Sequence, residues 1–197
     1  SVSLLMQVMD TGTIVYELGG WAAPWGIEYR IDTLNAFVLV IVSAIGAVVM
    51  PYARRSVEKE IPVSRIYIFY SMMLLCQTGL MGIAITGDAF NLFVFLEISS
   101  LSSYVLISFG TDRRALTAAY RYLIMGTIGA TFYIIGVGFM YNVTGSLNIH
   151  DLSTLIPEMA GSRTVQAALA FLTVGLGLKV ALFPLHMWLP NAYAYAP

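Results

Sequence analysis

The chain has 197 residues, of which 58% are hydrophobic and only 11% are charged, and its mean hydropathy is +0.79. This composition excludes a water-soluble domain and predicts a polytopic membrane protein. The net charge of −1, with basic residues scattered between apolar segments, gives no sign of nucleic-acid binding. The single Cys76 excludes an intrachain disulfide and cannot hold a metal ion by itself.

The first residues read as the end of a helix followed by a hairpin. We interpret residues 1–9 as the last turns of a membrane helix whose beginning is missing. Within residues 10–32, Thr13 to Leu18 and Gly26 to Ile31 are short strand-like runs on either side of glycines and a proline. This pattern predicts a β-hairpin with a long turn, which we expect on the external surface.

Residues 33–197 contain five apolar segments, each long enough to cross a hydrocarbon core of about 30 Å as a helix. In lipid every backbone amide must be paired, and these runs exceed the roughly 10 residues of a barrel strand, so an all-α bundle of five helices is expected. Several glycines within them favour close helix packing. The segments are Thr33 to Met50, Ile66 to Thr86, Leu92 to Phe109, Ala115 to Tyr141 and Val165 to Leu189.

Loop charges predict the orientation of the bundle. Six of the eight Lys and Arg residues in the expected loops follow the first and third segments, and cytoplasmic loops carry such an excess. Those loops are therefore expected to be cytoplasmic, with Arg121 anchored at headgroup level rather than lying in an ion path. The six residues are Arg54, Arg55, Lys59, Arg65, Arg113 and Arg114, and the other two are Arg30 and Arg163.

The outer loop between Asn142 and Arg163 is expected to hold a short interfacial helix. Either Asn148 or Asp151 can cap it ahead of an apolar run. The neighbouring His150 is expected to be a solvated loop residue.

Glu97 is the only Asp, Glu, Lys or Arg in its segment, and it lies nine residues past Asp88, near mid-membrane. An ionisable group at this depth costs roughly 3 kcal/mol and marks an ion or proton path. Ser100, Tyr104 and Ser108 follow at helical spacing on the same face. The alternative is a packing stripe of serines with Glu97 as a buried, hydrogen-bonded carboxyl.

Lys179 is likewise the only such residue in its segment. Pro184 cannot donate to the carbonyl of Val180, so the helix is expected to break one turn after the lysine. Broken helices at mid-membrane recur at ion sites in transporters. His186 lies seven positions beyond Lys179 and is a candidate proton relay if the helix continues, as are Ser100 and Tyr104.

Opposite charges on separate helices predict that Glu97 and Lys179 face each other. Burial favours the neutral form of each group, and mutual attraction restores the charges, so the pair can act as a switch. The alternative is a static buried ion pair that adds little net stability.

Two stretches carry a family resemblance: GDAFNLFVFLEISSLSSYVLISFG (Gly87 to Gly110) and LKVALFPLHMWLPNAYAYAP (Leu178 to Pro197). They resemble the D subunit of the Mrp-type multisubunit Na+/H+ antiporters, whose wider family includes antiporter-like subunits of respiratory complex I and membrane-bound hydrogenases. Complex I relatives typically have Trp before the glutamate, where this chain has Leu96. The NAYAYAP ending also resembles the antiporter version more closely.

The resemblance implies that Glu97 and Lys179 match the family's essential mid-membrane glutamate and its broken-helix lysine. It further implies a fragment of a larger inverted-repeat fold of about fourteen helices in a bacterial or archaeal cell membrane. Other membrane subunits of a hetero-oligomeric complex, protons and Na+ are the implied partners. The sequence contains no nucleotide, haem or iron–sulfur motif, so no cofactor is expected.

Three functions follow from these observations. The first is a secondary transporter subunit of a sodium/proton antiporter, and the second is a proton-pumping subunit of a complex I-like NADH-quinone oxidoreductase or hydrogenase. The third, a structural membrane module, leaves the mid-membrane charges without a purpose.

Overall fold

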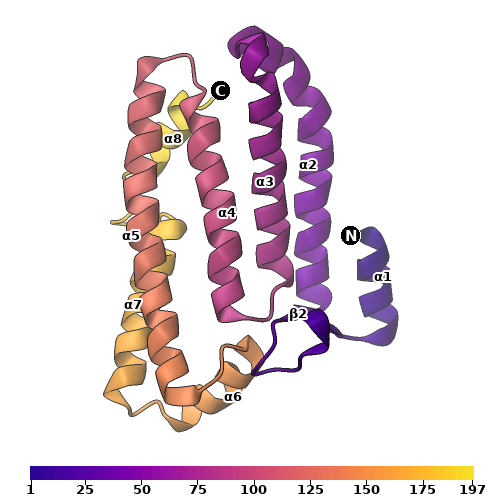
Figure 1. Cartoon of the computed structure of the whole chain (residues 1–197), viewed down its shortest axis with the longest axis vertical. Coiled ribbons are helices and arrows are strands. Elements are labelled where there is room, and N and C mark those ends of the chain that lie inside the picture. Colours follow the sequence, from indigo (N-terminus) through magenta and orange to yellow (C-terminus); the bar gives the residue numbers. More distant parts are fainter.

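The computed structural model describes all 197 residues as a bundle of helices with a small hairpin at one end (Figure 1). Four helices are long and apolar enough to cross a membrane, which confirms the prediction of an all-α polytopic membrane protein with a short β-hairpin. The four are α2 (Thr33–Glu60), α3 (Ile66–Ile85, preceded by the 3-10 turn η2, Val63–Arg65), α4 (Ala89–Ser108) and α5 (Arg113–Thr144).

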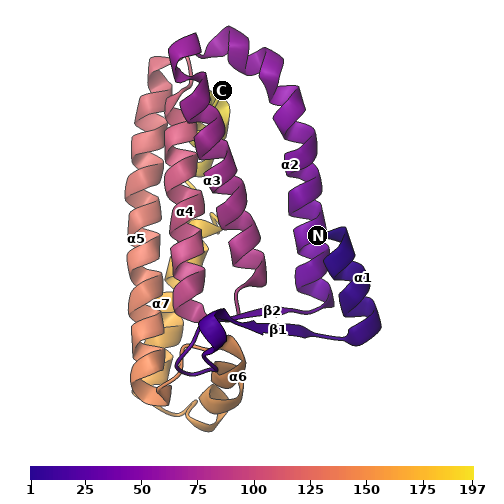
Figure 2. The same cartoon turned by 45° about the vertical axis from the view of Figure 1, so that its right-hand side comes forward.

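Smaller elements gather at one end, which we call the hairpin end. The predicted hairpin is present: β1 (Ile14–Glu17) pairs antiparallel with β2 (Glu28–Ile31), and the 3-10 turn η1 (Leu18–Gly20) lies in the connection. The first helix, α1 (Val2–Thr11), lies beside α2 (Figures 1 and 2).

The predicted short outer helix is also present at the hairpin end, as α6 (Ile149–Glu158). Of the two candidate caps, Asn148 is the one used, because its side chain accepts from the backbone N–H groups of His150 and Asp151. His150 is exposed, as expected.

The expectation that the first span ends at Met50 is wrong. Helix α2 continues for ten further residues to Glu60, through Pro51, and its last turns change direction at the upper end of the molecule (Figure 2). Proline removes one intrahelical hydrogen bond and bends a helix without having to end it. Arg54, Arg55 and Lys59 therefore lie on helix rather than in a loop.

The segment Val165 to Leu189 is not one helix with a kink after Lys179. Helix α7 (Arg163–Lys179) ends at the lysine itself, residues 180–188 form turns, and α8 (Leu189–Tyr195) follows. The expected break is thus present, but one turn earlier than Pro184 predicts. At 17 residues, α7 alone is shorter than the four membrane-crossing helices.

Helix α5 forms the centre of the packing, with α4 on one side and α7 on the other (Figure 1). A Cβ added to Gly175 of α7 would lie 2.6 Å from the backbone nitrogen of Tyr133, and one added to Gly129 would lie 3.0 Å from Leu178 Cβ. Glycine at these positions lets the two backbones approach closely, as small residues do in membrane bundles. The approach brings the end of α7 close to α5.

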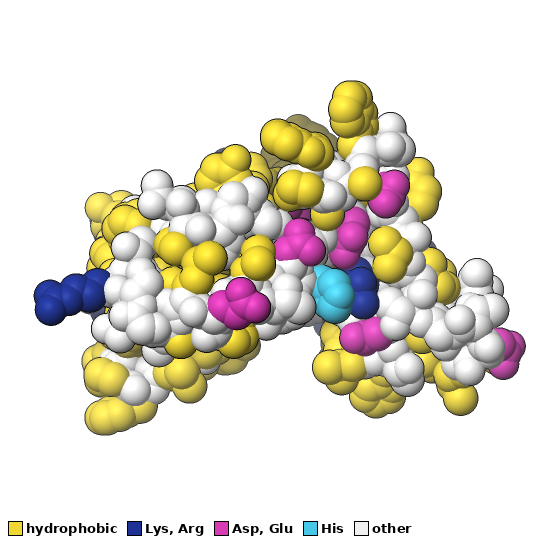
Figure 3. All heavy atoms as spheres, turned by 90° about the horizontal axis from the view of Figure 1, so that it is seen from below, with side chains coloured by type: hydrophobic (Ala, Val, Ile, Leu, Met, Phe, Trp, Pro, Cys, Tyr) yellow, Lys and Arg dark blue, Asp and Glu magenta, His cyan; other side chains and the backbone are white.

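The opposite end, which we call the basic end, holds the C-terminus of α2, η2 and the N-terminus of α5 (Figure 1). All six basic residues assigned to the cytoplasmic loops lie there, whereas Arg30 and Arg163 lie at the hairpin end. Viewed from the hairpin end, acidic side chains are more prominent than basic ones (Figure 3). The fold therefore groups the charges as the positive-inside pattern requires.

This grouping predicts the orientation of the protein in the membrane. In a Cys76→Ser background, we expect Ser153→Cys on α6 to react with an impermeant thiol reagent in intact cells, and Lys59→Cys on α2 to react only after permeabilisation. The control is labelling of both sites in open membranes. Modification of position 59 from outside, with none at 153, would reverse the orientation.

Candidate functional site

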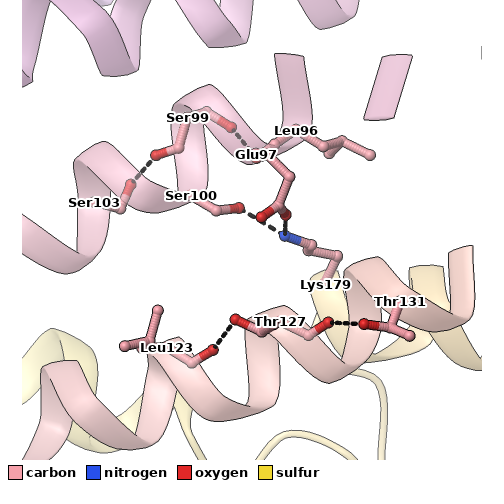
Figure 4. Close-up of polar contacts among 9 residues, drawn as sticks. All are labelled: Leu96, Glu97, Ser99, Ser100, Ser103, Leu123, Thr127, Thr131 and Lys179. Carbon is pink, nitrogen blue, oxygen red and sulfur yellow. Dashed lines mark hydrogen bonds and ion pairs between the residues drawn. The ribbon is translucent and has the colours of Figure 1, made fainter. Parts of the chain in front are cut away.

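Lys179 and Glu97 form a direct ion pair between α7 and α4 (Figure 4). The Lys179 ammonium donates to Glu97 Oε1 at 2.8 Å and to Ser100 Oγ at 2.8 Å. The Lys179 side chain is only 7% exposed and that of Glu97 is 21% exposed. The predicted facing pair is therefore present, without an intervening residue.

Helix α4 places Glu97 and Ser100 on one face because they are three residues apart. Its first turn is fixed by Asp88, whose carboxylate accepts from Asn91 N–H at 2.7 Å. Other serines of α4 bond to their own helix, as in the packing-stripe alternative: Ser99, Ser102, Ser103 and Ser108. Only Ser100 turns its hydroxyl to the ion pair.

The end of α7 sets the position of Lys179. The N–H of Leu182 bonds to the Gly177 carbonyl at 2.9 Å, and the N–H of Ala181 bonds to the Leu178 carbonyl at 3.3 Å. These two bonds form a Schellman motif, in which one residue takes the left-handed conformation. That residue is Ala181, with φ of 52°, where glycine is usual, at a cost of about 1–2 kcal/mol.

The helix end also suits the charge of Lys179. Unpaired carbonyls give the C-terminus of a helix a partial negative charge, which favours a cation in the last turn. Lys179 is the last residue of α7, so the carboxylate of Glu97 and the helix end both stabilise its ammonium group.

Tyr104 continues the polar face of α4 towards the basic end. Its side chain is buried, and its hydroxyl has no hydrogen-bond partner. The hydroxyl lies against Gly126 of α5, where a Cβ would collide with it. An unpartnered buried hydroxyl is costly and is therefore a candidate position for a water or a transferred proton.

His186 does not share a helix face with Lys179, because the helix does not continue past the lysine. His186 is instead half-buried in the turns of residues 180–188, beside the ring of Phe183. Its Nδ1 is buried without a hydrogen-bond partner. Pro184, the expected cause of the break, is exposed in the same turns.

Sequence reasoning missed two aromatic residues beside the site. Trp188 is 6% exposed, and its indole Nε1 donates to the Leu178 carbonyl at 3.0 Å. Its ring stacks on Tyr122 of α5, with ring centroids 3.9 Å apart and planes 3° from parallel. Tyr122 in turn meets the ring of Tyr104 edge-on at 4.5 Å. No pattern in the sequence predicts that Trp188 contacts Leu178 and Tyr122.

A cavity of about 470 Å³ opens at the basic end between α2, α3, α4, α5 and α8. Its wall is mostly apolar but includes Glu60 and Ser103. Tyr122 and Trp188 line it, whereas Glu97, Lys179 and Tyr104 do not. The aromatic pair therefore stands between the cavity and the polar cluster.

On the hairpin side the surroundings of the pair are apolar. Leu92 and Phe93, the turn of α4 before Glu97, pack with a buried cluster drawn from α4, α5, α6 and α7. Beyond this layer, burial raises the pKa of Asp88, although backbone hydrogen bonds from Asn91 and Phe90 oppose the shift. No group of three or more His, Cys, Asp or Glu side chains is placed to hold a metal ion.

Comparison with known proteins identifies the family. Residues 86–197, which contain Glu97, Lys179 and Trp188, match the model described as NADH:quinone oxidoreductase/Mrp antiporter, TM. The N subunit of NADH-quinone oxidoreductase from Desulforudis audaxviator is 50% identical over 182 residues, which cover 92% of this chain and 36% of that protein. The D subunit of the Na(+)/H(+) antiporter from Bacillus subtilis is 35% identical over 194 residues, covering 98% of this chain and 38% of that protein.

Solved structures show the same fold. The chain matches a subunit of an archaeal membrane-bound sulfane sulfur reductase with a TM-score of 0.85 and 35% identity, covering 100% of this chain and 39% of that one. It matches a chain of the Mrp complex from Dietzia sp. DQ12-45-1b with a TM-score of 0.83 and 27% identity, covering 99% of this chain and 36% of that one. The chain spans less than two fifths of each of these four proteins.

The family match extends over more than half of the chain, and the relatives include the D subunit of an antiporter, as the resemblance implied. This chain is therefore a multi-pass membrane protein that belongs to the NADH:quinone oxidoreductase/Mrp antiporter transmembrane family.

Proposed function

We propose that this chain is part of an ion-translocating subunit of a multisubunit monovalent cation (Na+)/proton antiporter, and that protons pass through Glu97 and Lys179. The observation that carries the proposal is the ion pair itself, with its 2.8 Å contact at the break of α7. The 35% identity to a protein named as the D subunit of a Na(+)/H(+) antiporter supports the choice of an antiporter.

The pair works as a switch because each charge depends on the other. A proton that reaches Glu97 neutralises the carboxylate, and the Lys179 ammonium then loses its counter-charge in a site that is only 7% exposed. A buried ammonium without a partner is costly, so Lys179 releases its proton. The proton on Glu97 then moves to the neutral Lys179 amine across the 2.8 Å contact, so that both groups regain their charges and the pair re-forms.

Ser100, Tyr104 and His186 are the proposed relays. Ser100 already accepts a hydrogen bond from Lys179, and Tyr104 lies one turn further towards the basic end on the same face. The buried, unpartnered Tyr104 hydroxyl and His186 Nδ1 are both free to bind a water that carries the proton. The route leads towards the cavity at the basic end, which we place in the cytoplasm.

In this proposal the whole protein is a secondary transporter subunit rather than an enzyme, and it acts with other membrane subunits. Its setting is a bacterial or archaeal cell membrane. Residues 1–9 belong to a membrane helix, residues 10–32 form an external hairpin, and residues 33–197 form most of the first of the two inverted repeats. No cofactor takes part in the proposed exchange.

The second candidate is a proton-pumping subunit of a redox enzyme. It is favoured by the 50% identity to the protein named as the N subunit of an NADH-quinone oxidoreductase. The same pair would serve both functions, so the subunits that copurify with the whole protein decide between them. Iron–sulfur and quinone-binding proteins would indicate the redox enzyme, and small membrane subunits alone would indicate the antiporter.

Lys179→Arg is expected to abolish exchange in everted vesicles that hold the full assembly. A guanidinium remains charged in proteins and cannot release a proton on cue. Lys179→Ala should fail as well, while the complex still assembles. The measurement is the Na+-dependent collapse of a pH gradient, and the control is Lys59→Arg, at the other lysine of the chain, which is exposed.

Wild-type rates in Lys179→Arg would refute proton release by Lys179 and leave only a fixed positive charge.

Glu97→Gln is expected to destabilise the α4 and α7 contact by about 3 kcal/mol, because it leaves a buried ammonium unpaired. Glu97→Gln combined with Lys179→Met should recover most of that loss, since it removes both charges together. Hydrogen exchange of the α7 amides in the assembled complex measures the effect, with the exposed Glu58→Gln as control. A double variant that opens more readily than Glu97→Gln alone would contradict this account of the pair.

A further inference from the structure

The left-handed turn after Lys179 has no glycine to support it. Ala181 adopts φ of 52°, a conformation that alanine disfavours. The sequence around it, Lys179 to Phe183, contains no glycine that could take this position instead. A contact from outside the turn therefore adds to the two hydrogen bonds of the Schellman motif in holding this geometry.

Trp188 is the side chain that reaches the turn from outside. Its indole N–H bonds to the Leu178 carbonyl, the same oxygen that accepts from the N–H of Ala181. Leu178 directly precedes Lys179, so the bond ties the peptide beside the lysine to the start of α8. The ring is fixed in turn by its stack on Tyr122 of α5.

The contact differs from ordinary burial of a tryptophan. Trp21 and Trp25, the other two tryptophans of the chain, are 69% and 88% exposed in the hairpin connection. Trp188 is 6% exposed, and its indole N–H is directed at one of the two carbonyls that close the helix end. A buried indole N–H needs an acceptor, but the acceptor here belongs to the turn that positions Lys179.

We propose that Trp188 is a positioning residue for Lys179: its indole N–H clamps the strained turn at Ala181 and so keeps the lysine ammonium within reach of Glu97 and Ser100. The proposal rests on the proton-carrying role given to Lys179 above. Trp188 does not carry protons. It acts through the backbone, by limiting the conformations that the end of α7 can adopt.

The sharpest test removes the indole N–H and nothing else. Replacement of Trp188 by 3-benzothienylalanine keeps the shape and the stacking but puts sulfur in place of N–H, and Trp188→Phe is the genetically simpler variant. In the full assembly both should slow exchange by roughly fivefold, the equivalent of one net hydrogen bond, and shift the pH profile of exchange. Assembly should remain at the wild-type level. Trp25→Phe, at an exposed tryptophan, is the matched control and should change neither the exchange rate nor its pH profile.

Rescue at a second position tests the clamp itself. Glycine adopts the left-handed conformation without strain, so Ala181→Gly should restore most of the rate and the wild-type pH profile in either Trp188 variant. Failure of this rescue would overturn the proposal. So would a wild-type rate without the indole N–H, or a loss of rate that only follows a loss of assembled complex.

The two proposals fail separately. If Lys179→Arg exchanges normally, the proton-release role is wrong whatever Trp188 does. If Lys179→Arg is inactive and the benzothienyl variant is normal, only the clamp is wrong.

Discussion

The structure depends on one constraint: the charged form of a lysine needs partners in a place where almost no solvent reaches it. Lys179 meets this constraint through three contributions, which are the carboxylate of Glu97, the hydroxyl of Ser100 and the negative end of α7. Helices α4 and α7 both pack along α5, and glycines let α7 approach closely enough for the two charges to meet. The backbone break is part of the same solution, because it puts the helix end at the lysine.

Much of this could be predicted from the sequence, since charges are rare in apolar segments and each one must have a partner. The helical bundle, the hairpin, the short outer helix and the facing of Glu97 and Lys179 could be predicted in this way, whereas the extents of the first and last spans and the choice of Asn148 over Asp151 as the cap could not. The position of the break could not be predicted. Proline is a strong sequence signal and glycine would have been another, but the helix ends at Lys179, and the left-handed residue of the turn that follows is an alanine. The contact from Trp188 to this turn is tertiary, and the periodicity of the sequence does not predict it.

The extended α2 illustrates the same limit. A proline followed by charged residues reads as the end of a membrane span, yet α2 bends and continues to Glu60. Val57 and Ile61 pack with Phe69 in a small buried cluster, so burial rather than local propensity keeps these turns helical. The result is one wall of the cavity at the basic end, which includes Glu60. A segment that the sequence presents as a loop thus lines the cavity that the proposed function uses as its access to the site.

The two sides of the ion pair differ in polarity, and under the proposed function this difference bears on how a proton leak is avoided. Towards the basic end lie Ser100, the Tyr104 hydroxyl and, behind the Tyr122 and Trp188 rings, the cavity. Towards the hairpin end lies a mostly apolar cluster, in which the Tyr133 hydroxyl is bound to the Ala89 carbonyl. A path open on both sides at once would dissipate any proton gradient. In the proposed mechanism, a polar approach on one side and a mostly apolar barrier on the other hold the proton on the pair, and the charge state of Lys179 governs its release.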